Sequence, residues 1–258
     1  MKRNKDLTSN NSDETVDKNI SEANPASKIQ IEQINETGAV VVTNGKYTIY
    51  CLTIVGEIEG HNYAEDFVKT TKYEKVIRQL VAIEESPSID GLLILLNTVG
   101  GDIEAGLSLA ELVSGMRKPT VSMVIGGGHS IGVPLAVAAK KTFIAKTASM
   151  MVHPVRTTGT VLGTSQAFEY LKRMQKRITR FVEDNSEISA ERFQKLVMNT
   201  CELDMDIGTV LEGKDAVEEG IIDKMGNLSD ALTCLYDMID SEKCKKNRKS
   251  KKSNKNND

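Results

Sequence analysis

Hydrophobic and polar positions along the middle of the chain follow two alternating patterns, one with the spacing of strands and one with the spacing of helices. The uncharged run Gly91–Leu96 is typical of a strand that is buried on both faces. Ala105, Leu109 and Met116 lie on one helical face, which predicts an amphipathic helix. Further strands are predicted at 120–125, 142–145 and 208–211, and further helices at 66–82, 131–139, 167–182 and 190–198. Repeated alternation of strand and helix predicts an α/β domain with a largely parallel sheet.

The two ends of the chain lack these patterns. Residues 1–36 are rich in Asn, Ser, Asp, Glu and Lys, and this composition predicts a disordered tail. Residues 241–258 are rich in lysine and are also expected to be a disordered tail, so the folded domain should span 37–240. The lysine-rich end has two interpretations, a solvated end or an electrostatic contact with anionic lipid or nucleic acid.

Composition narrows the class of protein. The chain has 258 residues, of which 40% are hydrophobic, and this is enough for one sizeable core. The net charge of −3, the absence of Trp and a 4% share of aromatic residues argue against a nucleic-acid-binding protein. The four cysteines form no CxxC pair, so we expect neither a zinc site nor a disulfide framework. The first residues lack the apolar core of a secretory signal, and the expected location is cytoplasmic.

One uncharged run, Pro119–Ala139, raises the question of a membrane span. Its centre reads GGGHSIG and Pro134 follows, which favours a turn over a continuous helix. We therefore predict a buried strand, a turn and a buried helix in this region.

Two glycine-rich turns follow predicted strands and precede predicted helices. They are Asn97–Asp102 (NTVGGD) and Gly126–Gly132 (GGGHSIG). Each turn places backbone N–H groups near a helix N-terminus, where they can hold a phosphate or a developing oxyanion. In the second turn, Gly128–Gly132 matches the G-x-S-x-G nucleophile elbow, in which a sharp strand-to-helix turn exposes the serine hydroxyl. Ser130 is therefore a candidate nucleophile, and the alternative is that it only caps the following helix.

A serine hydroxyl is a poor nucleophile unless a base takes its proton, and three histidines are available. His129 is adjacent to Ser130, and on a tight turn its side chain points away from that of its neighbour. His61 lies in a loop before the first predicted helix, whereas His153 follows an apolar pair and precedes a proline, so His153 is our candidate base. The α/β-hydrolase fold is excluded, because no acid lies between Ser130 and His153 and no histidine follows His153.

These turns and their neighbours resemble the ClpP family of serine peptidases (peptidase S14). The order and spacing agree over about 49–232, and the stretches that carry the resemblance are LLILLNTVGGDIEAGLSLAELV, VSMVIGGGHSIGVPLAVAAK, ASMMVHPV and GKDAVEEGIIDKM. Within the family the chain is most similar to the translocation-enhancing TepA branch. The resemblance implies a ClpP/crotonase-like fold of ββα repeats with a protruding handle helix, here around 167–183.

The resemblance also implies the roles of individual residues and the partners. Ser130 corresponds to the family's nucleophile and His153 to its base, and the backbone N–H groups of Gly101 and Ile131 correspond to its oxyanion-hole donors. It implies peptide or unfolded-protein substrates, an acyl-enzyme, no cofactor and no metal, and a homo-oligomeric ring that is a heptamer or a stacked pair of heptamers. The branch implies a link to protein export or quality control.

The sequence departs from the family pattern at three places in the first half of the chain. The SPGG turn reads TVGG at Thr98–Gly101, and His129 replaces a small residue before Ser130. The N-terminal segment that contacts an unfoldase in the family has no match here, which argues against an ATP-dependent unfoldase as partner.

A fourth departure concerns the catalytic acid. The family's aspartate position falls at Gly208, which has no side chain. Asp206 is our first candidate to replace it and Asp204 the second, because alternate residues of an extended stretch share one face. The alternative is that both are solvated acids and that a backbone carbonyl or a water molecule orients His153.

Two other functions stay open. A Ser–Lys peptidase of the signal-peptide-peptidase kind would use Lys140, Lys141 or Lys146 as the base. A catalytically degenerate crotonase-fold subunit, with a binding or assembly role, would be compatible with a glycine at position 208. Retained activity after His153→Ala would indicate a lysine base, and failure of a fluorophosphonate to label Ser130 would favour the binding subunit.

Overall fold

The computed structural model describes residues 39–61, 64–65, 67–156, 164–200 and 207–254. The chain divides into two compact units, Met1–Val40 and Val41–Asp258, and the description below concerns the second. The expected tail at 1–36 and its boundary lie outside the described residues.

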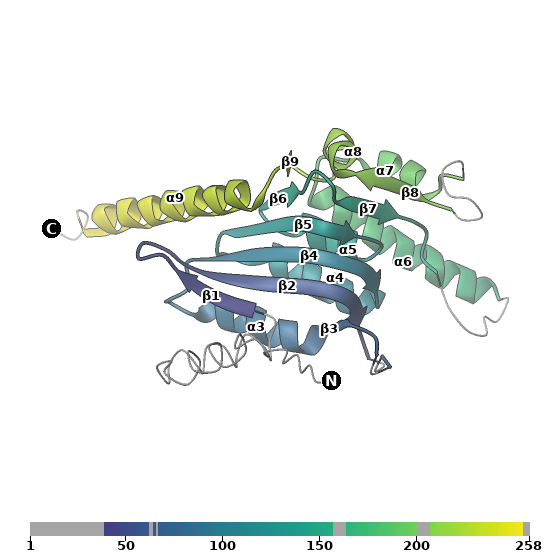
Figure 1. Ribbon diagram of the computed structural model, residues 1–258, viewed down its shortest axis with the longest axis horizontal. Coiled ribbons are helices and arrows are strands. Elements are labelled where there is room, and N and C mark those ends of the chain that lie inside the picture. The colour runs from purple at the N-terminus through teal and green to yellow at the C-terminus, as the bar shows by residue number, and fades with distance from the viewer. Residues whose placement is uncertain (1–38, 62–63, 66, 157–163, 201–206, 255–258) are drawn as a thin grey trace, which may run out of the picture. The chain divides into compact units, whose positions relative to one another are not determined.

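A sheet of mostly parallel strands forms the centre of this unit (Figure 1). Strands β1, β2, β4, β5, β6 and β9 follow one another across it, β3 pairs with β2, and β7 pairs with β5 and, antiparallel, with β8. The strands are β1 Ala39–Thr43, β2 Thr48–Glu59, β3 Thr70–Lys72, β4 Gly91–Gly101, β5 Thr120–Gly128, β6 Lys141–Ile144, β7 Ser149–Val152, β8 Thr209–Glu212 and β9 Lys224–Met225. The predicted α/β class and the parallel pairing of β2, β4, β5, β6 and β9 are confirmed.

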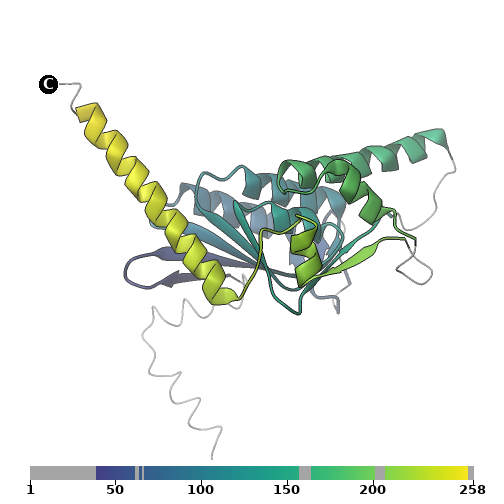
Figure 2. The same ribbon diagram turned by 90° about the horizontal axis from the view of Figure 1, so that it is seen from above.

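Helices cover both faces of the sheet (Figure 2). They are α3 Tyr73–Glu85, α4 Ile103–Ser114, α5 Gly132–Val137, α6 Ser165–Asp184, α7 Ala190–Val197, α8 Gly213–Glu218 and α9 Leu228–Asn254. One apolar cluster joins α3, α4 and α5 to the sheet, and a second joins α9 to the other face. No helix among the described residues is long and apolar enough to cross a membrane.

Strand β4 shows why the run GLLILL is apolar throughout. Leu92, Ile94 and Leu96 belong to the cluster beneath α3, α4 and α5, whereas Leu93 belongs to the cluster beneath α9. Successive side chains of a strand point to opposite faces, and here both faces are covered by helices. The strand continues to Gly101, so the first glycine turn is the end of β4 itself.

Two elements differ from their sequence-based prediction. The helix expected from residue 66 begins at Tyr73, because Thr70–Lys72 pair with Glu57–Glu59 of β2 as a short strand, and β-branched threonines favour that conformation. Residues 241–254, expected to be part of a disordered tail, continue α9 as a helix. Lys and Arg are good helix formers, and the helix that they extend is already anchored by the buried side chains of Ala231, Leu235 and Ile239.

Candidate active site

The candidate nucleophile lies on a strained turn between β5 and α5. Ser130 has φ 56°, and it is the one non-glycine residue with positive φ in the described part of the chain. Its backbone N–H donates to Met151 O at 2.8 Å, which ties the turn to the neighbouring strand β7. A side chain is held in this sparsely populated region only when its surroundings fix it, and such strain is typical of functional sites.

The end of β4 approaches this serine so closely that glycine is required there. A Cβ on Gly100 would lie 2.7 Å from Ser130 Cβ and 3.3 Å from Ser130 Oγ. A Cβ on Gly101 would lie 2.3 Å from Ile58 O, and both glycines have positive φ. Thr98 supports the turn, since its hydroxyl donates to Gly56 O at 2.6 Å and accepts from the N–H of Gly100 at 3.0 Å. The backbone of β4 therefore forms one wall of the site.

The side chain of Asn97 joins the two glycine turns. Its Oδ1 accepts from the N–H of Gly127 at 2.9 Å, at a place where the β4–β5 register shifts between Leu96 and Thr98. A Cβ on Gly126 would lie 2.5 Å from the same oxygen, so a larger residue there would displace the Asn97 side chain. This role of Asn97 is not predictable from the sequence, because an asparagine in a glycine-rich turn is usually a turn former.

The candidate base follows strand β7 and is held by its own neighbour. His153 Nδ1 lies 2.8 Å from Pro154 O, so Nδ1–H donates to this carbonyl and the lone pair of the neutral ring is on Nε2. This is the tautomer that a serine peptidase needs in its base. The sequence carried no signal for this contact, since every residue has a carbonyl group.

Ser130 and His153 line one cavity of about 150 Å³ together with Gly101 and Ile131. All four residues that the resemblance singles out therefore lie at the same cavity. The backbone N–H of Ile131 has no described acceptor, and among the described residues the Ser130 hydroxyl makes no hydrogen bond. The remaining wall is mostly apolar, formed by Ile103, Val152, Pro154, Val155, Arg156, Gln175, Ile178, Phe193 and Val197.

Position 208 lies beside the candidate base but cannot carry a side chain in this backbone. Gly208 has φ 142°, and a Cβ there would lie 2.4 Å from Val152 O and 2.9 Å from His153 Cβ. The acid candidates Asp204 and Asp206 lie outside the described residues. The group seen on His153 Nδ1 is the Pro154 carbonyl.

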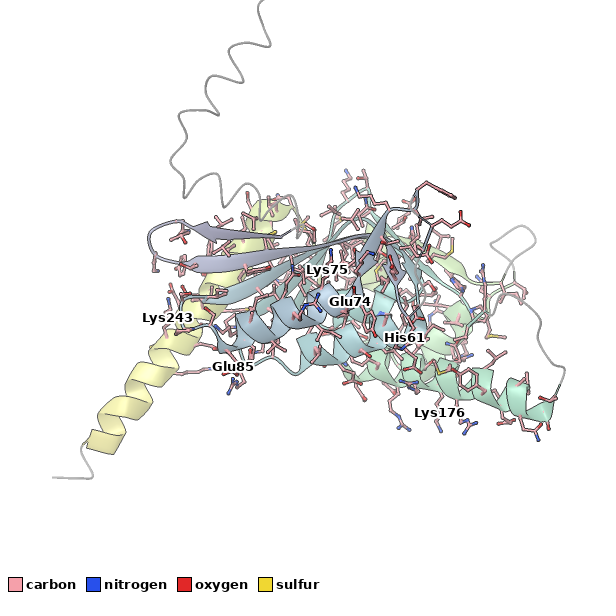
Figure 3. The ribbon with its side chains drawn as sticks, turned by 90° about the horizontal axis from the view of Figure 1, so that it is seen from below. His61, Glu74, Lys75, Glu85, Lys176 and Lys243 are labelled. Atoms are coloured by element: carbon pink, nitrogen blue, oxygen red, sulfur yellow. The ribbon has the colours of Figure 1, made fainter. Side chains whose placement is uncertain are left out.

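The other two histidines have different surroundings. His129 packs against Gly127, its Nδ1 is buried without a described partner, and its pKa is lowered by burial and by the nearby charge of His153. His61, labelled in Figure 3, packs edge-to-face against Tyr73, with ring centroids 5.8 Å apart. It is not among the residues that line the cavity. His153 is therefore the histidine placed to act on Ser130.

The three alternative lysine bases do not line the cavity either. Lys140 Nζ donates to Arg117 O at 2.5 Å, and Lys141 Nζ pairs with Asp223 at 3.0 Å. Lys146 is exposed in the loop after β6. The geometry thus favours a histidine base.

The family model for Clp protease matches residues 59–228, which is more than half of the chain and includes all four cavity residues named above. The chain belongs to the Clp protease family. Its similarity to the translocation-enhancing protein TepA of Halalkalibacterium halodurans is 51% identity over 214 residues, covering 83% of this chain and 84% of that protein. The resemblance to this family and to its TepA branch is confirmed.

More distant members of the Clp protease family are also similar. The ATP-dependent Clp protease proteolytic subunit of Lactococcus lactis is 26% identical over 158 residues, covering 58% of this chain and 74% of that protein. The structure of a ClpP1 point mutant from Listeria monocytogenes superimposes with a TM-score of 0.56 at 23% identity, covering 70% of this chain and 94% of that one. The predicted ClpP-like fold is thereby confirmed.

Proposed function

We propose that this Clp protease family member is a serine endopeptidase that cleaves peptides or unfolded proteins through an acyl-enzyme. The observation that carries the proposal is the meeting of Ser130, His153, Gly101 and Ile131 at one cavity. Acyl transfer needs a nucleophile, a base in the right tautomer and backbone N–H groups that stabilise the oxyanion.

The reaction has two halves. Ser130 Oγ attacks the carbonyl carbon of the scissile bond and gives its proton to His153 Nε2, which requires the two side chains to approach when substrate binds. The N–H groups of Gly101 and Ile131 stabilise the oxyanion, and the leaving amine takes the proton from Nε2. Water then attacks the acyl-enzyme, His153 takes its proton, and Ser130 is restored.

The first experiment removes the two reacting groups. Ser130→Ala and His153→Ala should each lower kcat on fluorogenic peptides by about 1,000-fold or more, and a fluorophosphonate should label the wild-type chain at Ser130. His61→Ala is the matched control, because this histidine lies off the cavity, and it should keep wild-type activity. Wild-type activity in Ser130→Ala would remove this serine from the mechanism.

The third member of the catalytic set is either a carboxylate or the Pro154 carbonyl. A carbonyl dipole orients the imidazole but stabilises the imidazolium less than a full negative charge does, so we expect a slow Ser–His dyad. Under this proposal Asp206→Asn changes kcat by less than about threefold, ~0.65 kcal/mol of barrier. A loss of orders of magnitude would assign the acid to Asp206.

The proposal includes the assembly and the setting. We propose a cytoplasmic ring of identical subunits, a heptamer or a stacked pair, with a role in protein export or quality control. The name of the translocation-enhancing TepA relative supports the link to translocation, and the name of the Lactococcus relative, a proteolytic subunit, supports assembly. Neither name identifies the substrate.

A further inference from the structure

Charge is unevenly distributed along this chain. The chain has 33 basic and 36 acidic residues, and residues 243–258 hold eight of the basic residues but one of the acidic ones. The preceding 242 residues therefore carry 25 basic and 35 acidic residues, a net charge of −10, whereas the last 16 carry +7. The eight basic residues are Lys243, Lys245, Lys246, Arg248, Lys249, Lys251, Lys252 and Lys255.

The first half of α9 is docked on the sheet, and two of its acids, Asp240 and Glu242, take part in that docking. Asp240 accepts from Lys46 Nζ at 2.7 Å and from the Tyr47 hydroxyl at 2.8 Å. Glu242 pairs with Lys140 at 3.6 Å. The ring of Tyr47 also stacks on Tyr236 of α9, with centroids 4.4 Å apart. The acidic half of the helix is thus fixed to the body by packing and by ion pairs.

The second half of α9 leads away from the sheet. Lys243 pairs with Asp90 at 2.7 Å, and from there both views show the helix continuing past the β1–β2 turn (Figures 1 and 2; Lys243 is labelled in Figure 3). Seven of the ten residues at 243–252 are basic and none is acidic. These residues continue α9 as a helix, so the basic residues follow one another closely along one element.

The composition of this half indicates which anionic partner it fits. It has no aromatic side chain for stacking on bases, and its basic residues are one arginine and six lysines. Arginine is preferred for bidentate phosphate and base recognition, whereas lysine is a hydrated point charge that suits a diffuse layer of headgroups. Four to eight basic residues on one helix are typical of segments that bind anionic lipid.

We propose that the basic half of α9, residues 243–254, binds an anionic membrane surface and tethers the acidic body beside it. The body is repelled by the same surface, so the helix contacts the membrane by its end and the sheet is held away. The contact is electrostatic and peripheral, since residues 243–258 contain one apolar residue, Cys244. This inference is independent of the peptidase chemistry, and it predicts the same binding for the Ser130→Ala chain.

Vesicle flotation with the full chain tests the proposal. The chain should float with phosphatidylcholine vesicles that contain about 30% phosphatidylglycerol at about 0.1 M salt, not with pure phosphatidylcholine, and not at about 0.5 M salt. Neutralising Arg248, Lys249, Lys251 and Lys252 together to Gln should weaken partitioning by at least about 100-fold. The matched control removes the same charge from exposed positions of the body, Lys75, Arg78, Lys195 and Lys214 to Gln, and should partition as the wild type does or only slightly more weakly, because it makes the repelled body more acidic.

Three results would overturn the proposal. One is binding to anionic vesicles that is equal in the wild type and in the α9 variant. Another is α9-dependent binding of duplex DNA or RNA that is tighter than vesicle binding at the same salt. A third is salt-sensitive self-association that depends on α9 in the absence of vesicle binding, which would assign the acidic body of a second copy as the partner.

Discussion

Gly208 lies against the main chain of Val152 and against His153, and it is the position to which the resemblance assigns the family's aspartate. The backbone there has φ 142°, a region that side chains rarely adopt. An acid could not be placed at this position without moving the strand end. The hydrogen-bond acceptor for His153 Nδ1 is instead the backbone carbonyl of Pro154.

The steric surroundings of Gly208 predict how a substitution there changes the stability of the fold. Gly208→Ala should cost at least about 3 kcal/mol of stability, because the backbone strain and the clash with Val152 O add. Gly45→Ala is the matched control, since Gly45 has φ 84° with nothing within 4 Å, and it should cost about 1 kcal/mol. Thermal unfolding of both variants measures the difference, and equal losses would contradict the steric argument.

Gly208→Asp extends the same prediction to activity. The new carboxylate should not raise kcat, because the chain must shift before it can reach His153. A rise in kcat with an unchanged melting temperature would show that the backbone accommodates the acid.

The residues of the candidate site differ in how far the sequence points to them. An elbow glycine pattern and a histidine after an apolar pair are local signals, and the structure places the residues that they indicate, Ser130 and His153, at one cavity. Asn97 and the Pro154 carbonyl were not predictable, since their roles depend on which strand ends meet in space. Asp206 was inferred from strand alternation alone and stays a prediction.

At the scale of elements, α4 and α6 are joined by one bidentate ion pair beside the cavity. Arg177 donates to Glu104 at 2.6 and 2.9 Å, and the two side chains are about half exposed. The hydrogen bonds from Arg177 lower the pKa of Glu104 below its ordinary value. An exposed pair of this kind contributes less than about 1 kcal/mol, so it orients α6 more than it stabilises the fold.

A double-mutant cycle over Glu104→Gln and Arg177→Gln tests this pair. Because the folded-state pKa of Glu104 is depressed, the coupling should be present above the unfolded-state pKa of about 4.3 and lost as the pH falls through the lower folded-state pKa. Chemical unfolding at pH 7 and near pH 3 measures it. A coupling energy that is unchanged near pH 3 would show that the ionised carboxylate is not its source.

Elements were predicted better than their ends. The run GLLILL predicted a doubly covered strand because such strands are apolar at every position, and β4 is one. The predicted start of α3 was wrong, because residues 70–72 pair with β2 as strand β3 although the local sequence has a helical pattern. The helical state of 241–254 was not predicted, because the composition of this segment does not show that the preceding part of α9 is packed against the sheet.

On the scale of the whole molecule, α9 decides where the chain can be cut. The buried Ile239 and the Lys243–Asp90 pair hold this helix to the body, so limited proteolysis should stop near residue 245. Removal of the following residues should leave peptidase activity unchanged. Mass spectrometry of the resistant core measures the boundary, and rapid cutting before residue 239 would show that α9 does not dock.

Assembly is the second prediction at this scale. The first half of α6 exposes Phe168 and Tyr170 by 59% and 51%, and exposed apolar groups of this kind mark interfaces. Light scattering should give a mass several times that of the 28.3 kDa chain, and Phe168→Ser with Tyr170→Ser should lower it. Arg173→Ser, an exposed polar position on the same helix, is the control. A monomer at micromolar concentration in the wild type would contradict the ring.

The docking of α9 has a consequence for how the chain is made. Lys46 and Asp240, which meet in the folded molecule, are 194 residues apart in the sequence. The sheet residues that α9 covers, among them Leu93, Val121 and Phe143, are synthesised well before Leu235, which buries them. At roughly 5–20 residues per second, the roughly 90 residues between β6 and Leu235 take several seconds or more. During that time an apolar face of a largely formed sheet is open to water, so the nascent chain depends on protection from aggregation until its last helix emerges.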